Sequence, residues 1–375
     1  MLPVRIYVNA SRHVGCKVVS LTQRALPIAS KNRFQNPTSC DQTRSLSTST
    51  TPPTHPEAIF SGIQPTGVPH LGNYLGALKQ WVDLQNSAPP STELLYCVVD
   101  LHAITQPQDP HDLRRRRQDT MAMLLAVGLK AERCVIFEQS RVAAHSQLMS
   151  PLDPDGSSKL KLGLFSYPVL QAADILLYGT TLVPVGEDQV QHLELARSLA
   201  GKFNRTFGKI LVVPKVKLAP AKRVMSLTNP TSKMSKSGSV NSQINLDHSE
   251  SEIRLRIRGA LTDSIPGISY DREARPGVSN LIEMMGNMTN RDDFEVIAQE
   301  CEGLNMKEFK DRVADSVVEG LKGIKGEYER IKGDASYLEE VSRTGAEKAN
   351  KRANETLERV MEAMGMGVGP KPSSP

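Results

Sequence analysis

The chain has 375 residues, enough for about two domains, and a formal net charge of +5. It contains no run of about 18 apolar residues, so a membrane-spanning helix is not predicted. None of its five cysteines forms a CxxC pair, which argues against a thiolate metal site and favours small buried thiols in a reducing compartment.

Residues 1–50 hold the excess positive charge. This segment has seven basic side chains and one acid, Asp41, so it carries +6 and the remaining chain −1. A segment rich in Arg and Ser and poor in acids is typical of a mitochondrial transit peptide, which predicts delivery to the mitochondrial matrix. A merely disordered tail is the alternative.

Segments of strand and helix length alternate after Pro56. We expect strands at 58–63, 93–104 and 134–140, and helices at 71–84 and from 110 to 128. Asp109 can cap the second helix, and Pro110 suits its first turn. Such alternation predicts a parallel sheet with helices on both faces.

The second half of the chain is mainly helical. A Pro/Gly/Ser-rich loop is expected at 150–161, a helix at 164–179 beginning near Pro168, a strand and turn at 181–189, and a helix at 191–203. From Ser249 onward amphipathic helices follow, with a break at 274–281 and an apolar stripe on the last helix. The composition of the tail 367–375 indicates disorder.

The string PTGVPHLGN, from Pro65 to Asn73, follows the first predicted strand. Glycines in a strand–helix turn let the backbone approach a phosphate, and the amino end of the helix supplies free N–H groups. His70 adds a side-chain donor. An ordinary turn with a surface histidine explains the string equally well, and GxGxxG is absent, so an NAD site is not indicated.

A second string, KMSKS, spans Lys233 to Ser237. Two lysines on a polar loop can neutralise the charge that builds on departing pyrophosphate. Although most charge runs are solvated, this five-residue motif occurs after the first string in the chain, which favours function. The run Arg114–Arg117 can contact nucleic-acid phosphates, but a solvated helix face is the preferred interpretation.

Taken together with further sequence motifs, these two strings make the chain resemble the tryptophanyl-tRNA synthetases of the bacterial and mitochondrial branch, which are class I enzymes. The similarity runs from about Ala58 to Gly365, and its markers are IFSGIQPTG, HLGNYLGAL, VDLHAIT, YPVLQAADILLY, VPVGEDQ, KMSKS and ARPGVSNL. It implies a Rossmann-like, doubly wound α/β catalytic domain at 55–248. A helical anticodon-binding region at 249–366 would follow, its last helix packing back on the catalytic domain.

The resemblance implies a chemistry. Tryptophan attacks the α-phosphorus of ATP, which enters with Mg²⁺, and the tryptophanyl group then passes to tRNA(Trp). Since a carboxylate is already a nucleophile, alignment and charge stabilisation suffice. A homodimer without a membrane partner or a tightly bound metal is expected.

The resemblance also assigns residues. His70, Lys233 and Lys236 are the expected catalytic groups. The ATP contacts are Gln64, Pro65, Thr66, Gly72, Asn73, Gly186, Glu187, Asp188, Val224, Lys233, Met234, Ser235, Lys236 and Ser237. The tryptophan contacts are Asp174, Tyr167, Gln171, Gln189, Phe60 and His102, with Asp174 accepting the indole N–H. A structural Asp174 satisfied by a neighbouring arginine, and Phe60 and His102 as plain core, are the alternatives.

One stretch departs from the family pattern. Between Gln147 and Tyr167 the chain reads LMSPLDPDGSSKLKLGLF, and near 148–160 about 20–30 residues of helix that relatives carry are missing. A splice variant or a gene-model error is hypothesised rather than a tolerated deletion. The remaining alternatives are an RNA-binding paralogue without activity and a tyrosyl-type synthetase.

Overall fold

The computed structural model describes residues 57–105, 108–152, 162–186, 189–218, 223–236 and 238–367. Several predictions fall outside these ranges: the transit peptide at 1–50, most of the shortened loop, the tail beyond residue 367, and the site residues Glu187, Asp188 and Ser237.

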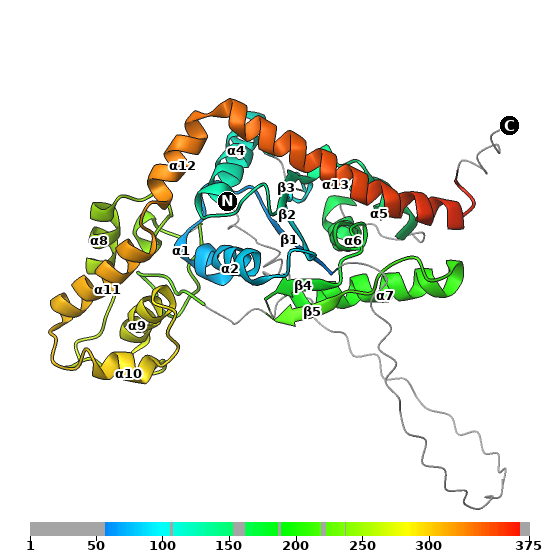
Figure 1. Cartoon of the computed structure of the whole chain (residues 1–375). Coiled ribbons are helices and arrows are strands. Elements are labelled where there is room, and N and C mark those ends of the chain that lie inside the picture. Colours follow the sequence, from blue (N-terminus) through cyan, green and yellow to red (C-terminus); the bar gives the residue numbers. More distant parts are fainter. Residues whose placement is uncertain are drawn as a thin grey trace, which may run out of the picture. The chain divides into compact units, whose positions relative to one another are not determined.

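A parallel sheet forms the centre of the fold (Figure 1). Its strands are β1 (Ala58–Ile63), β2 (Glu93–Val98), β3 (Val135–Glu138), β4 (Leu182–Val185) and β5 (Lys215–Leu218), in the order β3-β2-β1-β4-β5. All four neighbouring pairs are parallel. The expected Rossmann-like arrangement is therefore confirmed. The four-residue strand β5 was not predicted, because its alternating sequence KVKL is too short to stand out.

Alternate side chains of the strands enter two different hydrophobic clusters. Ile59 and Ile63 of β1 join one cluster, and Ala58 and Phe60 join the other. The same alternation occurs in β2, where Tyr96 faces the first cluster and neighbours on either side face the second. A strand covered on both faces needs apolar residues at successive positions, which explains why the sequence is apolar from Leu94 to Val99.

Helices cover both faces of the sheet (Figure 1). Before β4 they are α1 (Leu71–Asn73), which continues through a π-helical turn (Tyr74–Leu78) into α2 (Lys79–Ser87), α3 (Asp100–Ala103), α4 (Pro110–Ala126), α5 (Ala144–Leu152) and α6 (Leu162–Leu176). After β4 come α7 (Val190–Phe207), α8 (Glu250–Arg258), α9 (Pro276–Met288), α10 (Phe294–Gln299), α11 (Met306–Gly320), α12 (Ile324–Gly333) and α13 (Ala335–Ala363). Of these, α8 to α11 pack on one another to one side of the sheet instead of on its faces (Figure 1). As predicted, Asp109 caps α4 by accepting from the Asp112 N–H at 2.9 Å.

Three predicted boundaries were wrong. The second strand ends at Val98, because Asp100 begins a helical turn and its carboxylate accepts hydrogen bonds from Ser140. Pro168 lies inside α6, which begins at Leu162. The break in the helical half precedes ARPGVSNL, because Pro276 is the first residue of α9, where a missing N–H costs nothing.

The last helix, α13, crosses the sheet at β3 and also contacts α5 (Figure 1). Gly345 allows this crossing: a Cβ at that position would overlap the Ile136 carbonyl oxygen. The predicted apolar stripe is buried at Leu357 and Val360. The domain boundaries drawn from the sequence stay a prediction.

Among the described residues, no helix is both long enough and apolar enough to span a bilayer. The thiols of Cys97, Cys134 and Cys301 are buried, as expected, and their burial raises the pKa of each. These cysteines pack as small apolar residues.

Candidate active site

The two motifs lie side by side because a segment after KMSKS pairs with the first motif. The Leu71 N–H donates to the Ile244 carbonyl at 2.7 Å, and the Leu246 N–H donates to the Pro69 carbonyl at 3.0 Å. In addition, Lys236 Nζ donates to the Thr66 carbonyl at 2.5 Å. One KMSKS lysine is therefore held against the turn that follows β1.

Glycines shape this turn. Gly67 has a φ of +95°, which favours glycine, and a Cβ there would lie 3.0 Å from Lys236 Nζ. A Cβ at Gly72 would lie 3.0 Å from the His70 ring and 3.7 Å from the Val224 Cβ. The structure thus brings the expected residue Val224 beside His70 and Gly72, which lie about 150 residues earlier in the sequence.

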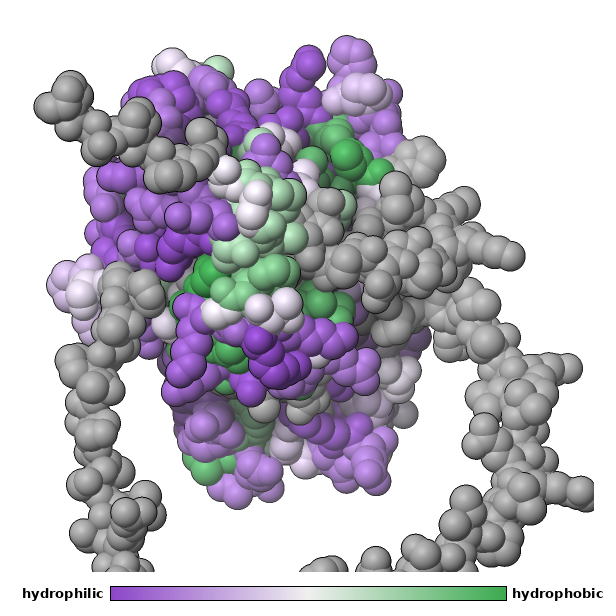
Figure 2. Space-filling view, turned by 90° about the vertical axis from the view of Figure 1, so that its right-hand side faces the viewer, coloured by the Kyte–Doolittle hydropathy of each residue, from purple (hydrophilic) through white to green (hydrophobic). Residues whose placement is uncertain are grey.

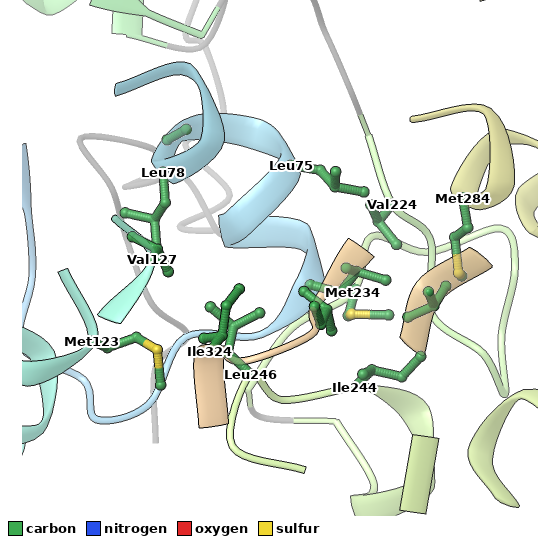
Figure 3. Close-up of a cluster of buried hydrophobic side chains, with 14 of the residues drawn as sticks. Leu75, Leu78, Met123, Val127, Val224, Met234, Ile244, Leu246, Met284 and Ile324 are labelled. Carbon is green, nitrogen blue, oxygen red and sulfur yellow. The ribbon is translucent and has the colours of Figure 1, made fainter. Parts of the chain in front are cut away.

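The KMSKS loop is closed by short antiparallel pairing. Met225 and Lys233 form a bridge, and the Met234 N–H donates to the Val224 carbonyl at 3.0 Å. The Met234 side chain is 2% exposed and points into the hydrophobic cluster beside Val224 and Ile244 (Figure 3). Met234 therefore anchors the loop.

Asn280 holds the base of the same loop. Its side-chain Oδ1 accepts from the Met225 N–H at 2.9 Å, and its Nδ2 donates to the Met225 carbonyl at 3.1 Å. Asn280 is buried, so these bonds are shielded from water. The sequence contained this residue within the marker ARPGVSNL, but no local pattern indicates that it reaches back over 55 residues.

Charge and burial set the protonation of the site. Burial, followed by the charges of Lys236 and Lys233, lowers the pKa of His70 to about 3, so this imidazole is neutral at working pH. Burial and then the charge of Arg116 lower the pKa of Lys236 to about 8. Lys236 is therefore mostly charged at pH 7 and titrates just above it.

Two polar atoms of the first motif are buried without a hydrogen-bond partner in the described part of the chain: Thr66 Oγ1 and His70 Nδ1. Buried polar atoms are normally paired, and unpaired ones at a functional site indicate a missing ligand. Together with the Lys236 ammonium, they suit the phosphates of a nucleotide.

A second polar group surrounds Asp174 on α6. Its Oδ1 accepts from Gln139 Nε2 at 2.7 Å and lies 2.6 Å from His145 Nδ1, and its Oδ2 lies 3.0 Å from His102 Nε2. Although burial opposes ionisation, the imidazoles of His145 and His102 hold the pKa of Asp174 well below its usual range. Asp174 is thus a buried carboxylate whose partners include two histidines and an amide.

Sequence reasoning included His102 in this group but missed Gln139 and His145. His145 also lies 2.8 Å from the Tyr178 hydroxyl through its other ring nitrogen, Nε2. His102, Gln139, His145 and Asp174 stand on four different elements, so no spacing in the sequence connects them.

Four further residues were expected at the amino-acid pocket: Phe60, Tyr167, Gln171 and Gln189. The Phe60 ring stacks on Tyr178 at 5.5 Å, and the Tyr167 ring contacts His192 edge-on at 5.5 Å. Gln171 and Gln189 are buried. Phe60 also belongs to the core, as the plainer interpretation stated, while its proposed substrate contact stays a prediction.

The first motif lies where the direction of winding of the sheet reverses, between β1 and β4. In the strand order β1 lies at the centre with β4 beside it, and Gln64–His70 and Gly186 follow the carboxyl ends of these two strands. Open α/β sheets bind ligands in the crevice at this switch point. Fold and site therefore define a nucleotide-binding α/β enzyme of the class I synthetase type.

Comparison with known proteins gives the family. The sequence profile of tRNA synthetases class I (W and Y) matches residues 52–154 and 154–322, and the chain belongs to this family. It is 40% identical to the mitochondrial tryptophan–tRNA ligase of Schizosaccharomyces pombe, covering 83% of this chain and 96% of that protein. It is 44% identical to the tryptophan–tRNA ligase of Mycobacterium leprae, covering 82% and 96%.

A solved structure agrees. The tryptophanyl-tRNA synthetase of Campylobacter jejuni complexed with ADP and tryptophan superposes with a TM-score of 0.68 at 30% identity, covering 82% of this chain and 99% of that one. The chain is thus an aminoacyl-tRNA ligase of the α/β class.

The alignments contain a gap. The profile match falls into two parts that meet at residue 154. The alignment with the S. pombe protein is 347 positions long but uses 83% of this chain, which leaves about 35 positions without a residue here. The same arithmetic for the M. leprae protein, over 329 positions and 82%, leaves about 20.

Proposed function

We propose that this protein joins tryptophan to tRNA(Trp) in two steps, first forming tryptophanyl-adenylate and pyrophosphate from tryptophan and ATP. The observation that carries the proposal is the contact between the two motifs, in which Lys236 reaches the turn at Thr66. The tryptophan–tRNA ligases that resemble the chain over most of its length support the choice of amino acid.

In the first step, the residues act by position and charge. The turn Gln64–Gly67 and the helix that begins at Leu71 offer backbone donors to the phosphates, and Lys233 and Lys236 oppose the charge that develops on departing pyrophosphate. His70, being neutral, contributes a ring N–H instead of a charge. Mg²⁺ enters with ATP as part of the substrate and supplies further neutralisation of the phosphates.

The Asp174 group recognises the indole. A buried ring N–H needs an acceptor, and Asp174 is an ionised acceptor with both oxygens inside the protein. Oδ1 has Gln139 and His145 as partners and Oδ2 has His102, so the indole N–H would be a further donor to an already hydrogen-bonded carboxylate. An amino acid without this N–H makes one hydrogen bond fewer with the carboxylate and is bound more weakly.

The protein acts as a homodimer in the mitochondrial matrix. Figure 2 shows apolar residues gathered between hydrophilic zones on the side of the molecule where α5, α6 and the ends of α7 and α13 lie, which supports a protein partner there.

The basic segment 1–50 and the mitochondrial S. pombe relative support import. Light scattering should give a particle of two chains, and a fusion lacking residues 1–50 should stay outside mitochondria.

A second candidate follows from the gap. If the missing helices complete the amino-acid pocket, this form is a catalytically impaired splice or gene-model variant, or an RNA-binding paralogue. The profile match that divides at residue 154 supports the loss of a segment. Sequencing the transcript across Gln147–Tyr167 tests this: absence of the segment from every transcript would show that the short form is the natural one.

The substrate is tested by charging tRNA(Trp) and tRNA(Tyr) with their amino acids. We expect charging with tryptophan only. Preferential charging with tyrosine would assign the chain to the tyrosyl type. Binding of tRNA(Trp) without charging by either amino acid, with charging restored when the relatives' segment is inserted, would favour the impaired form.

A further inference from the structure

The four consecutive arginines at 114–117 have four different surroundings. Arg114 and Arg115 are exposed, and Arg115 pairs with Asp112 at 2.7 Å. Arg117 contacts Asp100 at 2.9 Å and Glu138 at 2.8 Å, so it binds the carboxyl ends of β2 and β3. The run is therefore not one solvated face, and Arg116 remains to be explained.

Arg116 lies beside the turn that carries the first motif. A Cβ at Gly67 would be 3.7 Å from Arg116 Cγ and 3.0 Å from Lys236 Nζ. Thus a side chain of α4 and a side chain of the KMSKS loop flank the same glycine, whose missing Cβ leaves room for both. The Arg116 side chain is only 23% exposed.

The hydrogen bonds of Arg116 are long for a guanidinium that is mostly shielded from solvent. It lies 3.2 Å from Gln108 Oε1 and 3.3 Å from Asp112 Oδ2, at the long end of hydrogen-bond distances. Asp112 is shared with Arg115, whose contact is shorter. One carboxylate thus serves two arginines, and Arg116 keeps donors that these partners do not satisfy well.

Arg116 and Lys236 place two positive charges beside one glycine turn, where Asp112 pairs with Arg116 and the charges of Asp247 and Asp119 act on Lys236. Lys236, held on the Thr66 carbonyl, is partly buried, and Arg116 is the charge that most strongly lowers the pKa of Lys236. Two cations gathered on one glycine turn repel each other, and an anion between them would remove this repulsion. A guanidinium suits a phosphate particularly well, because it can donate two parallel hydrogen bonds.

We propose that Arg116 binds the terminal phosphates of ATP and, after the reaction, pyrophosphate, as a third cation beside Lys233 and Lys236. The inference rests on the proposed function, since it names a further group at the same nucleotide site. It also explains why one arginine of the run turns toward Gly67 instead of toward solvent.

The test compares Arg116→Gln and Arg116→Lys with two controls, Arg114→Gln on the exposed face and Asp112→Asn, which removes the ion-pair partner of Arg116. Tryptophan-dependent ATP–pyrophosphate exchange gives KM for ATP and for tryptophan, and calorimetry gives the binding of inorganic pyrophosphate alone. For Arg116→Gln we expect KM for ATP to rise about tenfold, pyrophosphate binding to weaken comparably, and KM for tryptophan to change less than twofold. Arg116→Lys should recover part of the loss.

In both controls, KM for ATP, KM for tryptophan and the affinity for pyrophosphate should stay within twofold of the parent values, and Tm should be unchanged. If Asp112→Asn reproduces the effect of Arg116→Gln, Arg116 acts only through its ion pair and the inference is wrong. Unchanged pyrophosphate binding in Arg116→Gln also overturns it. If the parent chain binds pyrophosphate in an Arg116-dependent way but shows no tryptophan-dependent exchange, the inference holds and the proposed function fails.

Discussion

Replacing Lys236 by arginine should abolish the pH dependence of kcat/KM for ATP that the titration of Lys236 causes. Burial and the nearby Arg116 lower the pKa of Lys236 to about 8, whereas arginine stays charged throughout. A lysine with this pKa is about 90% charged at pH 7 and about 10% charged at pH 9. Because the charged form binds phosphate, kcat/KM for ATP should fall roughly tenfold over this interval through loss of this charge.

The assay is ATP–pyrophosphate exchange at limiting ATP and saturating tryptophan, from pH 6.5 to 9.5, for the parent and Lys236→Arg. Titration of the substrates is common to both proteins and cancels in the ratio of their kcat/KM values. This ratio, parent over variant, should fall about tenfold between pH 7 and 9 with a midpoint near 8. His70 adds no transition in this range, since its pKa is about 3. A ratio that is flat up to pH 9.5 would refute the reasoning.

Three further substitutions test other contacts. Asp174→Asn should raise KM for tryptophan by about 100-fold and leave KM for ATP near its parent value, because it removes a charged acceptor from the indole site; equal effects on both substrates would contradict this role. Asn280→Ala should lower kcat in the exchange assay by about tenfold with little change in Tm, because the base of the KMSKS loop loses two hydrogen bonds; an unchanged kcat would show that Asn280 does not position the loop. Gly345→Ala should lower the free energy of unfolding by about 3 kcal/mol, because its methyl group would overlap the Ile136 carbonyl oxygen. Gly326→Ala, in α12 with no atom near a Cβ, is the matched control and should be neutral or stabilising in urea denaturation.

The sheet was largely predictable from the sequence because its central strands are buried on both faces. A continuous apolar run located β2, and local capping residues located the start of α4. The prediction failed where a tertiary contact decides the outcome. Asp100 ends the apolar run after β2 by accepting hydrogen bonds from Ser140, which stands 40 residues further along the chain.

The sequence motifs indicated candidate residues of the site, but the contacts among the residues of the site could not be predicted from the sequence. The sequence identified His70, Lys236 and Asp174 through their resemblance to known strings. It could not identify Arg116, because the neighbouring arginines look identical and only the packing of α4 beside Gly67 distinguishes them. Gln139 and His145 lack any motif, and their place around Asp174 follows from how α5 and α6 pack.

The central claim is that the two motifs form one ATP site that activates tryptophan. The most direct measurement is ATP–pyrophosphate exchange by this chain as its sequence stands, with tryptophan, with tyrosine and with no amino acid. The account predicts exchange with tryptophan alone, reduced at least 100-fold in Lys236→Ala, since removal of one preorganised charge from a transition state typically costs this much. Exchange that is absent with tryptophan, or that survives in Lys236→Ala, would contradict it.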